Sequence, residues 1–237
     1  MKNSPPLIDF HSHILPCVDH GSGSLAETRE QLQIVCSSGV DTIVATPHFY
    51  PNANSVEHFS QTVQSAIQEI QGANVPTPNI CIGAEVLCCP QLEQMEGIKS
   101  LCVQGTDVLL LEAPFNHWHS EFFYTVEALL KRFTVVLAHI DRYVRYQEKE
   151  LWILLEMGAL AQINGFAFSS LTQRKLLKPF LESGRVVALG SDFHGTNPKE
   201  YAQFLASRKR LGDTFDSIME RSASLLRSAT VAIPNQS

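Results

Sequence analysis

Apolar and polar residues alternate along the chain in a repeating pattern of short apolar runs and longer amphipathic segments. The apolar runs are rich in Val, Ile and Leu, and they predict strands at residues 7–10, 42–46, 80–84, 108–111, 134–138, 159–163 and 186–189. Between them, hydrophobic residues recur at helical spacing and predict helices over residues 24–38, 55–71, 120–132, 148–157, 170–182, 197–211 and 215–228. A short helix is also expected before the run at 108–111.

Helix boundary signals support this division. Ser24 and Glu27 have the spacing of a capping box at the start of the first predicted helix, and Gly39 follows its end. Strands that are apolar throughout and alternate with helices are typical of a parallel sheet buried on both faces. Seven such units without a long linker predict one barrel-like α/β domain over residues 1–237, with a loose tail at 233–237. A doubly wound open sheet is the alternative.

Composition narrows the class of protein. The chain has 237 residues, of which 44% are hydrophobic, and 18 basic against 24 acidic residues give a net charge of −6. An acidic chain is not expected to bind nucleic acid in general. No apolar run approaches the roughly 20 residues that a membrane span needs, and no apolar signal-peptide core follows Lys2. We therefore expect a cytoplasmic protein without membrane insertion. The sequence does not indicate an oligomeric state.

Side chains that can bind metals follow six of the predicted strands. These are His11, His13, His20, His48, Glu85, Glu112, His139, Asp192 and His194. In an α/β barrel the C-terminal strand ends meet on one face, where active sites lie. Residues separated by up to about 180 positions are therefore expected to converge on one site.

The residue types at these positions favour a catalytic metal cluster. One histidine beside a strand is ordinarily a hydrogen-bonded loop residue, but Glu85 and Glu112 lie in apolar runs, where an unpaired carboxylate is costly. Imidazole and carboxylate without thiolate suit Mn²⁺, Fe or Zn²⁺ in a catalytic site, and none of the six cysteines forms a Cys-x-x-Cys pair. Nine ligands are enough for two or three ions, an arrangement typical of phosphoester hydrolysis.

In their order along the chain, these motifs resemble the polymerase-and-histidinol-phosphatase (PHP) family, and most of all its bacterial manganese-dependent protein-tyrosine phosphatases of capsule and exopolysaccharide synthesis. The matching segments are residues 9–16, 19–22, 43–48, 83–86, 110–112, 137–143 and 190–194. The resemblance implies a distorted (β/α)7 TIM-like barrel of the PHP type. It also implies two or three divalent ions, with Mn as the expected metal and Fe or Zn as alternatives. The implied reaction is hydrolysis of phosphotyrosine by a metal-bridging hydroxide.

The resemblance further implies a role for each residue. The first metal would be held by His11, His13, Glu85 and Asp192, the second by Glu85 as a bridge with Glu112 and His139, and the third by His20, His48 and His194. Arg142 and Lys199 would bind the phosphate of the substrate, with Arg142 as the catalytic residue. His20 stands where this branch usually has Asp, and Lys199 where it usually has Arg.

The substrate implied by the resemblance is a phosphotyrosine protein, namely the tyrosine-rich tail of a bacterial tyrosine kinase. Two alternatives stay open: a small-molecule phosphatase of the same family acting on histidinol phosphate or a nucleotide, and a metal-binding module without turnover. Aromatic residues near the strand ends would form either a slot for the phosphotyrosine ring or ordinary loop packing. They are Phe49, Tyr50, Phe115, Trp118, Phe166, Phe168 and Phe193.

Overall fold

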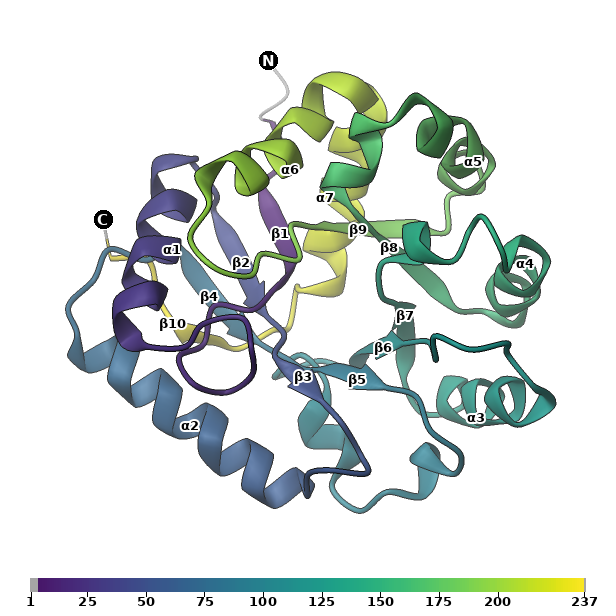
Figure 1. Ribbon diagram of the computed structural model, residues 1–237, viewed down its shortest axis with the longest axis horizontal. Coiled ribbons are helices and arrows are strands. Elements are labelled where there is room, and N and C mark those ends of the chain that lie inside the picture. The colour runs from purple at the N-terminus through teal and green to yellow at the C-terminus, as the bar shows by residue number, and fades with distance from the viewer. Residues whose placement is uncertain (1–3, 237) are drawn as a thin grey trace.

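The computed structural model describes residues 4–236 and consists of parallel sheets with helices around the outside of the strands (Figure 1). The strands are β1 (Ile8–Ser12), β2 (Thr42–Ala45), β3 (His48–Phe49), β4 (Asn79–Ile82), β5 (Glu85–Leu87), β6 (Val108–Glu112), β7 (Thr134–Leu137), β8 (Leu160–Asn164), β9 (Val186–Gly190) and β10 (Val231–Ile233). The helices are α1 (Leu25–Ser37), α2 (Val56–Gly72), α3 (Ser120–Leu130), α4 (Glu148–Met157), α5 (Leu171–Glu182), α6 (Pro198–Leu211) and α7 (Asp213–Leu225). Short 3₁₀ helices cover Leu92–Gln94, Ile98–Leu101, Ile140–Arg142 and Gly165–Ser169.

The described strands form two sheets, with the orders β1-β2-β4-β10 and β3-β5-β6-β7-β8-β9. All pairings are parallel except that of β10 with β4. The sheets meet where Pro47 separates β2 from β3 and Gly83 separates β4 from β5. Backbone hydrogen bonds from Gly83 to Ala45 (2.9 Å) and from Glu85 to Pro47 (3.1 Å) cross this break. The prediction of a parallel α/β fold is thus confirmed, whereas the strands lie in two sheets and not in one continuous barrel sheet.

Burial follows the predicted apolar pattern. All residues of β1, β6 and β9 are buried, as expected for parallel strands that are covered on both faces. The predicted apolar face of α2 is also buried, including Phe59, Val63 and Ile67. These residues belong to one hydrophobic core, which also contains the apolar residues of the strands and so holds the strands in place.

Local sequence signals fix where the helices begin. The Ser24 hydroxyl accepts a hydrogen bond from the Glu27 amide (3.2 Å), and the Glu27 carboxylate accepts one from Gly23 (2.7 Å). The second bond goes to Gly23 instead of Ser24, so the motif is a capping box displaced by one residue. Gly158 ends α4 with a φ of 117°, a left-handed conformation that favours glycine.

The prediction of a loose tail at 233–237 is wrong for residues 233–236. Ile233 is buried in β10, which pairs antiparallel with β4. Beyond it, the Gln236 amide donates to the Thr77 carbonyl at 3.1 Å, and the Asn235 amide donates to Asn79 Oδ1 at 3.1 Å. The free edge of β4 offers unpaired backbone groups that this short apolar run satisfies. Ser237 lies outside the described residues.

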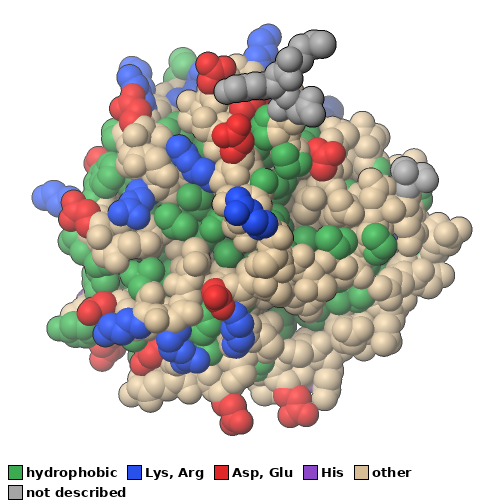
Figure 2. Space-filling view, turned by 180° about the vertical axis from the view of Figure 1, so that it is seen from behind, with side chains coloured by type: hydrophobic (Ala, Val, Ile, Leu, Met, Phe, Trp, Pro, Cys, Tyr) green, Lys and Arg blue, Asp and Glu red, His purple; other side chains and the backbone are tan. Residues whose placement is uncertain are grey.

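The two sides of the molecule differ in surface chemistry. On the face seen from behind, acidic and basic side chains are interspersed, and the coloured residues show no cluster of histidines (Figure 2). Of the helices described between residues 4 and 236, none combines the length and apolar character needed to cross a membrane.

Candidate metal centre

The C-terminal ends of the parallel strands bring most of the predicted ligands together. Strand register contributes directly, because His48 of β3 lies opposite Glu85 of β5 in the parallel pairing. His11 is the residue before the last of β1, Glu112 ends β6, and His139 follows β7. The converging side chains are buried, except for His20, which is exposed, and for Asp192 and His194, which are partly exposed.

Glu85 is surrounded by four imidazoles. Its Oε1 lies 2.5 Å from His139 Nε2, and its Oε2 lies 2.9 Å from His48 Nδ1, 3.1 Å from His11 Nε2 and 3.3 Å from His13 Nε2. Burial raises the pKa of a carboxyl group, but the facing imidazoles, His11 first, hold the pKa of Glu85 well below its usual range. Glu85 is therefore a buried, ionised carboxylate.

Asp192 forms a second centre beside the first. Its Oδ1 lies 3.4 Å from His13 Nε2, 3.5 Å from His194 Nδ1 and 3.8 Å from His11 Nε2. The two facing nitrogens of His11 and His13 are themselves only 3.1 Å apart. Burial, with the charge of His13 next, lowers the pKa of His194 to about 4, so this imidazole is neutral at pH 7 and free to ligate.

Several buried atoms of this cluster lack a hydrogen-bond partner within the described residues. They are Glu85 Oε2, Asp192 Oδ1, His48 Nδ1, His139 Nδ1 and His194 Nε2. Some lie close to another polar atom, but at angles that form no hydrogen bond, and unsatisfied buried polar atoms are costly. Divalent cations would satisfy them, and the imidazole–carboxylate donor set fits such ions.

Three groups of ligand atoms, each within 4.8 Å of one another, could hold a metal ion. They are His13 with His48 and His194, His11 with His13 and Asp192, and His48 with Glu85 and Glu112. His139 adjoins the last group, because its Nε2 lies 3.5 Å from Glu112 Oε1. The predicted ligands therefore converge as a set, with His13 and His48 shared between neighbouring groups.

His20 lies beside the group of His13, His48 and His194. Its ring centroid is 4.8 Å from that of His48 and 4.7 Å from that of His194. The turn after it passes so close to His13 that a Cβ at Gly21 would lie 2.1 Å from His13 Cβ, which only glycine avoids. The adjacent Asp19 faces His13 instead of a shared ion position.

Two sets of hydrogen bonds orient the ligands from outside the cluster. Asp19 Oδ2 lies 2.6 Å from His13 Nδ1 and also accepts from the His48 amide (2.9 Å), while Asp19 Oδ1 accepts from Gly21 (2.9 Å). Burial lowers the pKa of His13, but the bonds to Asp19, Asp192 and Glu85 together outweigh it and raise the pKa. Such a carboxylate–histidine pair turns the other ring nitrogen of His13 toward the ion.

Strand β8 supplies the second set, which sequence reasoning missed. Gln162 Oε1 accepts from the His139 amide (2.6 Å) and lies 3.2 Å from His11 Nδ1. Gln162 Nε2 donates to Asn164 Oδ1, and Asn164 Nδ2 donates to Asp192 Oδ2, both at 2.9 Å. The available signal was that Gln162 is polar within the predicted strand at 159–163 and that Asn164 directly follows this strand; both residues are fully buried.

His139 and Asp192 have left-handed backbone conformations, with φ of 32° and 53°. Each is the first or second residue after a strand, so the chain turns sharply there and directs the side chain into the cluster. Such conformations are uncommon outside glycine, and Asn, Asp and His tolerate them best.

Another acidic residue lies beneath the cluster, in β1. Asp9 is fully buried, and its Oδ1 accepts from the Ser191 amide at 2.8 Å. Its Oδ2 has no hydrogen-bond partner among the described residues. Burial raises the pKa of Asp9 from its ordinary value of 3.8 to about 6.

The two predicted phosphate-binding residues are placed differently. Arg142, in the 3₁₀ helix after His139, lies with Nη2 2.5 Å from Asp192 Oδ2 and Nη1 3.7 Å from Glu112 Oε1. Its side chain is 35% exposed, so part of the guanidinium faces out of the cluster. Lys199 is exposed at the start of α6, and no contact of its side chain with the cluster is found in residues 4–236.

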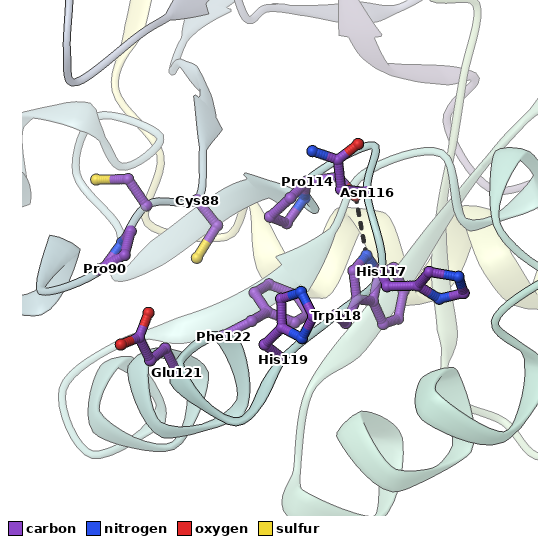
Figure 3. Close-up of a pocket in the computed structure, with 10 residues that line it drawn as sticks. Cys88, Pro90, Pro114, Asn116, His117, Trp118, His119, Glu121 and Phe122 are labelled. Atoms are coloured by element: carbon purple, nitrogen blue, oxygen red, sulfur yellow. Dashed lines mark hydrogen bonds between the residues drawn. The ribbon is translucent and has the colours of Figure 1, made fainter.

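The aromatic residues divide between the two interpretations. Phe49 and Phe168 are buried in the core, whereas Phe193, although buried, borders the hollow that also contains Asp192. Trp118 is also nearly buried, and its Nε1 donates to the Pro114 carbonyl (Figure 3). By contrast, Phe115 and Phe166 are exposed. Tyr50 is half-buried and stacks on His48, with ring centroids 5.2 Å apart.

This fold and site define a class of parallel α/β proteins that carry a candidate metal centre at the strand ends. Within that class, the chain belongs to the family described as "Capsular polysaccharide synthesis, CpsB/CapC", which matches residues 7–217. The motif resemblance to capsule-associated phosphatases is thereby confirmed at the level of the family.

Relatives with assigned activities match most of the chain. The tyrosine-protein phosphatase YwqE of Bacillus subtilis (strain 168) is 26% identical, and the match covers 93% of this chain and 91% of the relative. The tyrosine-protein phosphatase CpsB of Streptococcus pneumoniae is 28% identical, with 81% and 85% covered.

Solved structures agree on the fold. One structure belongs to a set described as crystal structures of YwqE from Bacillus subtilis and CpsB from Streptococcus pneumoniae, unique metal-dependent tyrosine phosphatases. It superimposes with a TM-score of 0.78 at 23% identity, and the match covers 98% of this chain and 100% of that chain. A TatD-family hydrolase of Entamoeba histolytica has a TM-score of 0.58 at 11% identity, and covers 94% and 98%. At these identities the likeness establishes the fold alone.

Proposed function

We propose that this protein is a metal-dependent phosphatase that hydrolyses phosphotyrosine in proteins. The observation that carries the proposal is the convergence of unsatisfied buried imidazole and carboxylate atoms beside the half-exposed Arg142. Family membership and the names of the relatives support the same activity. Manganese is the proposed metal, and iron or zinc would also suit this donor set.

We propose the ligand sets that the family resemblance implies: His11, His13, Glu85 and Asp192 would hold a first ion, Glu85, Glu112 and His139 a second, and His20, His48 and His194 a third. The observed groups overlap with these sets but differ in part, because His13 lies with His48 and His194, and His48 lies with Glu85 and Glu112. The contacts of Glu85 with four imidazoles support its role as a bridge. The stacking of His20 on His48 and His194 supports its place in the third set.

The chemistry is hydrolysis of a phosphate monoester. A water oxygen bonds to phosphorus, the bond from phosphorus to the tyrosine oxygen breaks, and the protons of the water finish on the phosphate and the tyrosine hydroxyl. Bound divalent ions would polarise the phosphoryl oxygens, acidify water and stabilise the leaving oxygen.

Protein side chains orient the substrate. Arg142 binds the phosphate through the N–H groups that do not face Asp192, and a charge-assisted bond in this partly buried position is strong. Lys199 is proposed as a second positive charge. Its neighbour Glu200 lines a hollow that also contains Asp192, which places the start of α6 at the edge of the site.

We also propose that the strands are arranged as a distorted (β/α)7 barrel. At the breaks, hydrogen bonds from Gly83 to Ala45 and from Glu85 to Pro47 keep the β4–β5 segment paired with the β2–β3 segment, so each segment can be counted as one long strand. At the opposite seam, the Asp192 amide donates to the His11 carbonyl (2.9 Å) and the His13 amide to the Phe193 carbonyl (3.2 Å). These bonds support a seven-stranded arrangement that closes between β9 and β1.

The proposed substrate is the tyrosine-rich tail of a bacterial tyrosine kinase that controls polysaccharide synthesis. The test is a panel of metals and substrates: metal-free protein is supplied with Mn²⁺, Zn²⁺ or Fe²⁺ and assayed on a phosphotyrosine peptide, histidinol phosphate and nucleotides. We expect turnover of the phosphotyrosine peptide that a chelator abolishes and Mn²⁺ restores. Efficient turnover of histidinol phosphate or a nucleotide, with none of the peptide, would overturn the proposal.

A further inference from the structure

Two hollows lie next to each other at the edge of the candidate metal centre, and Arg142 and Tyr146 line both of them. The larger, of about 790 Å³, is bounded by the loop 115–119 and by residues 142–147. The smaller, of about 390 Å³, is bounded by Arg145, Phe166 and the start of α5. Together they form what we call the Arg142 groove.

Arg142 joins this groove to the cluster. One side of its guanidinium contacts Asp192 and Glu112, while its exposed part faces the two hollows. A phosphate held at the cluster is therefore within reach of Arg142. The group attached to that phosphate can therefore extend from the site along the groove.

Exposed aromatic rings line both hollows of the groove. Phe115 is 74% exposed and Tyr146 is 76% exposed in the larger hollow, and Phe166 is 44% exposed in the smaller. Aromatic residues are enriched in protein-binding sites and supply much of the energy there. Rings left in water around a hollow therefore indicate a surface that a ligand covers.

The charge of the groove is opposite to that of the protein. The larger hollow is lined by Arg142, His117 and His119 and by no carboxylate, although the chain has 24 acidic against 18 basic residues. The smaller hollow adds Arg145, and its one acid, Asp141, is buried with Oδ1 accepting from the Asn164 amide at 2.9 Å. A negatively charged ligand would thus find complementary charge at Arg142 and Arg145, which line these hollows.

The wall of the larger hollow is held in place by Trp118. Its ring packs against Tyr143, with centroids 5.3 Å apart, and its Nε1 donates to the Pro114 carbonyl at 2.9 Å. Figure 3 shows this loop from the side of a neighbouring pocket, where His117 extends away from Pro90 and Cys88. A wall anchored in this way loses little conformational entropy when a ligand binds.

We propose that the Arg142 groove binds the polypeptide on both sides of the phosphotyrosine and selects substrates with acidic residues next to that tyrosine. The proposal rests on the proposed function, because it assigns the phosphate to Arg142. A phosphotyrosine within a protein has chain on both sides, and Arg142 lines both of the adjoining hollows. Phe115 and Tyr146 contact the chain, and Arg145 attracts its acidic side chains.

The test compares a phosphotyrosine peptide with acidic flanks against p-nitrophenyl phosphate, which has no flanking chain. Phe115→Ala and Tyr146→Ala should each lower kcat/KM on the peptide at least about fivefold more than on p-nitrophenyl phosphate, mainly through KM. Tyr124→Ala is the matched control, since Tyr124 is 68% exposed and lies outside both hollows. Arg145→Gln should lower kcat/KM more on the acidic peptide than on one with neutral flanks.

The outcomes separate the two proposals. If the wild-type protein hydrolyses p-nitrophenyl phosphate but no phosphotyrosine peptide, the proposed function fails. If it hydrolyses the peptide, and Phe115→Ala and Tyr146→Ala act equally on both substrates or no more than Tyr124→Ala, the groove proposal fails. A shift of these two variants from dimer to monomer on size-exclusion chromatography, with unchanged peptide kinetics, would assign the rings to contact between copies and overturn it as well.

Discussion

Replacing Asp19 with Asn tests whether this carboxylate prepares His13 for metal binding. Asp19 is acceptor-only and satisfies three donors, His13 Nδ1 and the amides of Gly21 and His48. Asparagine has nearly the same shape but offers one oxygen and one donating NH₂ group. Whichever way the amide turns, at least one of the three donors then faces another donor, and the bond to His13 loses its charge.

The size of the effect follows from these bonds. A hydrogen bond to a charged group contributes about 1.5–3 kcal/mol and a neutral one about 0.5–1.5 kcal/mol. Asp19→Asn should therefore weaken metal binding by about 1–2 kcal/mol, or about 5- to 30-fold in the dissociation constant. This range overlaps the losses of about 10- to 100-fold for partners of metal-binding histidines.

The assay is calorimetric titration of metal-free protein with Mn²⁺, and circular dichroism checks that the variant is folded. Asp41→Asn is the matched control, because Asp41 Oδ2 also accepts from a backbone amide, that of Leu7 (2.6 Å), but at the opposite end of β1. A dissociation constant for Asp19→Asn within twofold of wild type would refute the reasoning. So would an equal loss in Asp41→Asn.

Three further outcomes follow from other contacts. Glu85→Gln should lower bound metal, measured by elemental analysis, more than Glu112→Gln, because Glu85 contacts four imidazoles; an equal or reversed order contradicts the bridging role. Since burial raises the pKa of Asp9 to about 6, its ionisation destabilises the folded state as pH rises from about 4 to 6. With a chelator present, the free energy of unfolding of Asp9→Asn relative to that of wild type should increase by up to about 3 kcal/mol as the pH rises from about 4 to 6. A difference between the two proteins that does not depend on pH would disprove this. Ile233→Ala should cost about 2–4 kcal/mol in denaturant unfolding and Val231→Ala under about 1 kcal/mol; similar small costs would show that β10 contributes little.

The sequence predicts the regular elements well because their signals are local. The buried apolar runs mark the main parallel strands, and residues such as Ser24 and Ser55 mark helix starts through hydrogen bonds only three residues long. The convergence of the histidines is also predictable, since parallel strand ends meet at one edge. The division into two sheets is not, because it depends on how Pro47 and Gly83 interrupt long-range pairing.

The sequence did not predict which way the side chains next to the metal-binding residues point. Phe49 follows His48 in the two-residue strand β3, so the two side chains point to opposite faces, and Phe49 enters the core while His48 enters the cluster. Phe193 is likewise buried between Asp192 and His194, although these residues follow β9 and belong to no strand. The role of Gln162 could not be predicted for another reason. Its partners, His139 and His11, are 23 and 151 residues away in the sequence.

The left-handed backbones of His139 and Asp192 restrict how this cluster can evolve. Glutamate or cysteine would be strained at either position, whereas His, Asp and Asn are tolerated, and glycine would fit but bring no ligand. The residue types that accept this conformation largely coincide with the hard and borderline metal ligands. Drift at these two positions can therefore exchange an imidazole for a carboxylate at little cost in backbone strain, whereas a thiolate would cost more, although Cys17 shows that a cysteine can adopt this conformation in the same chain.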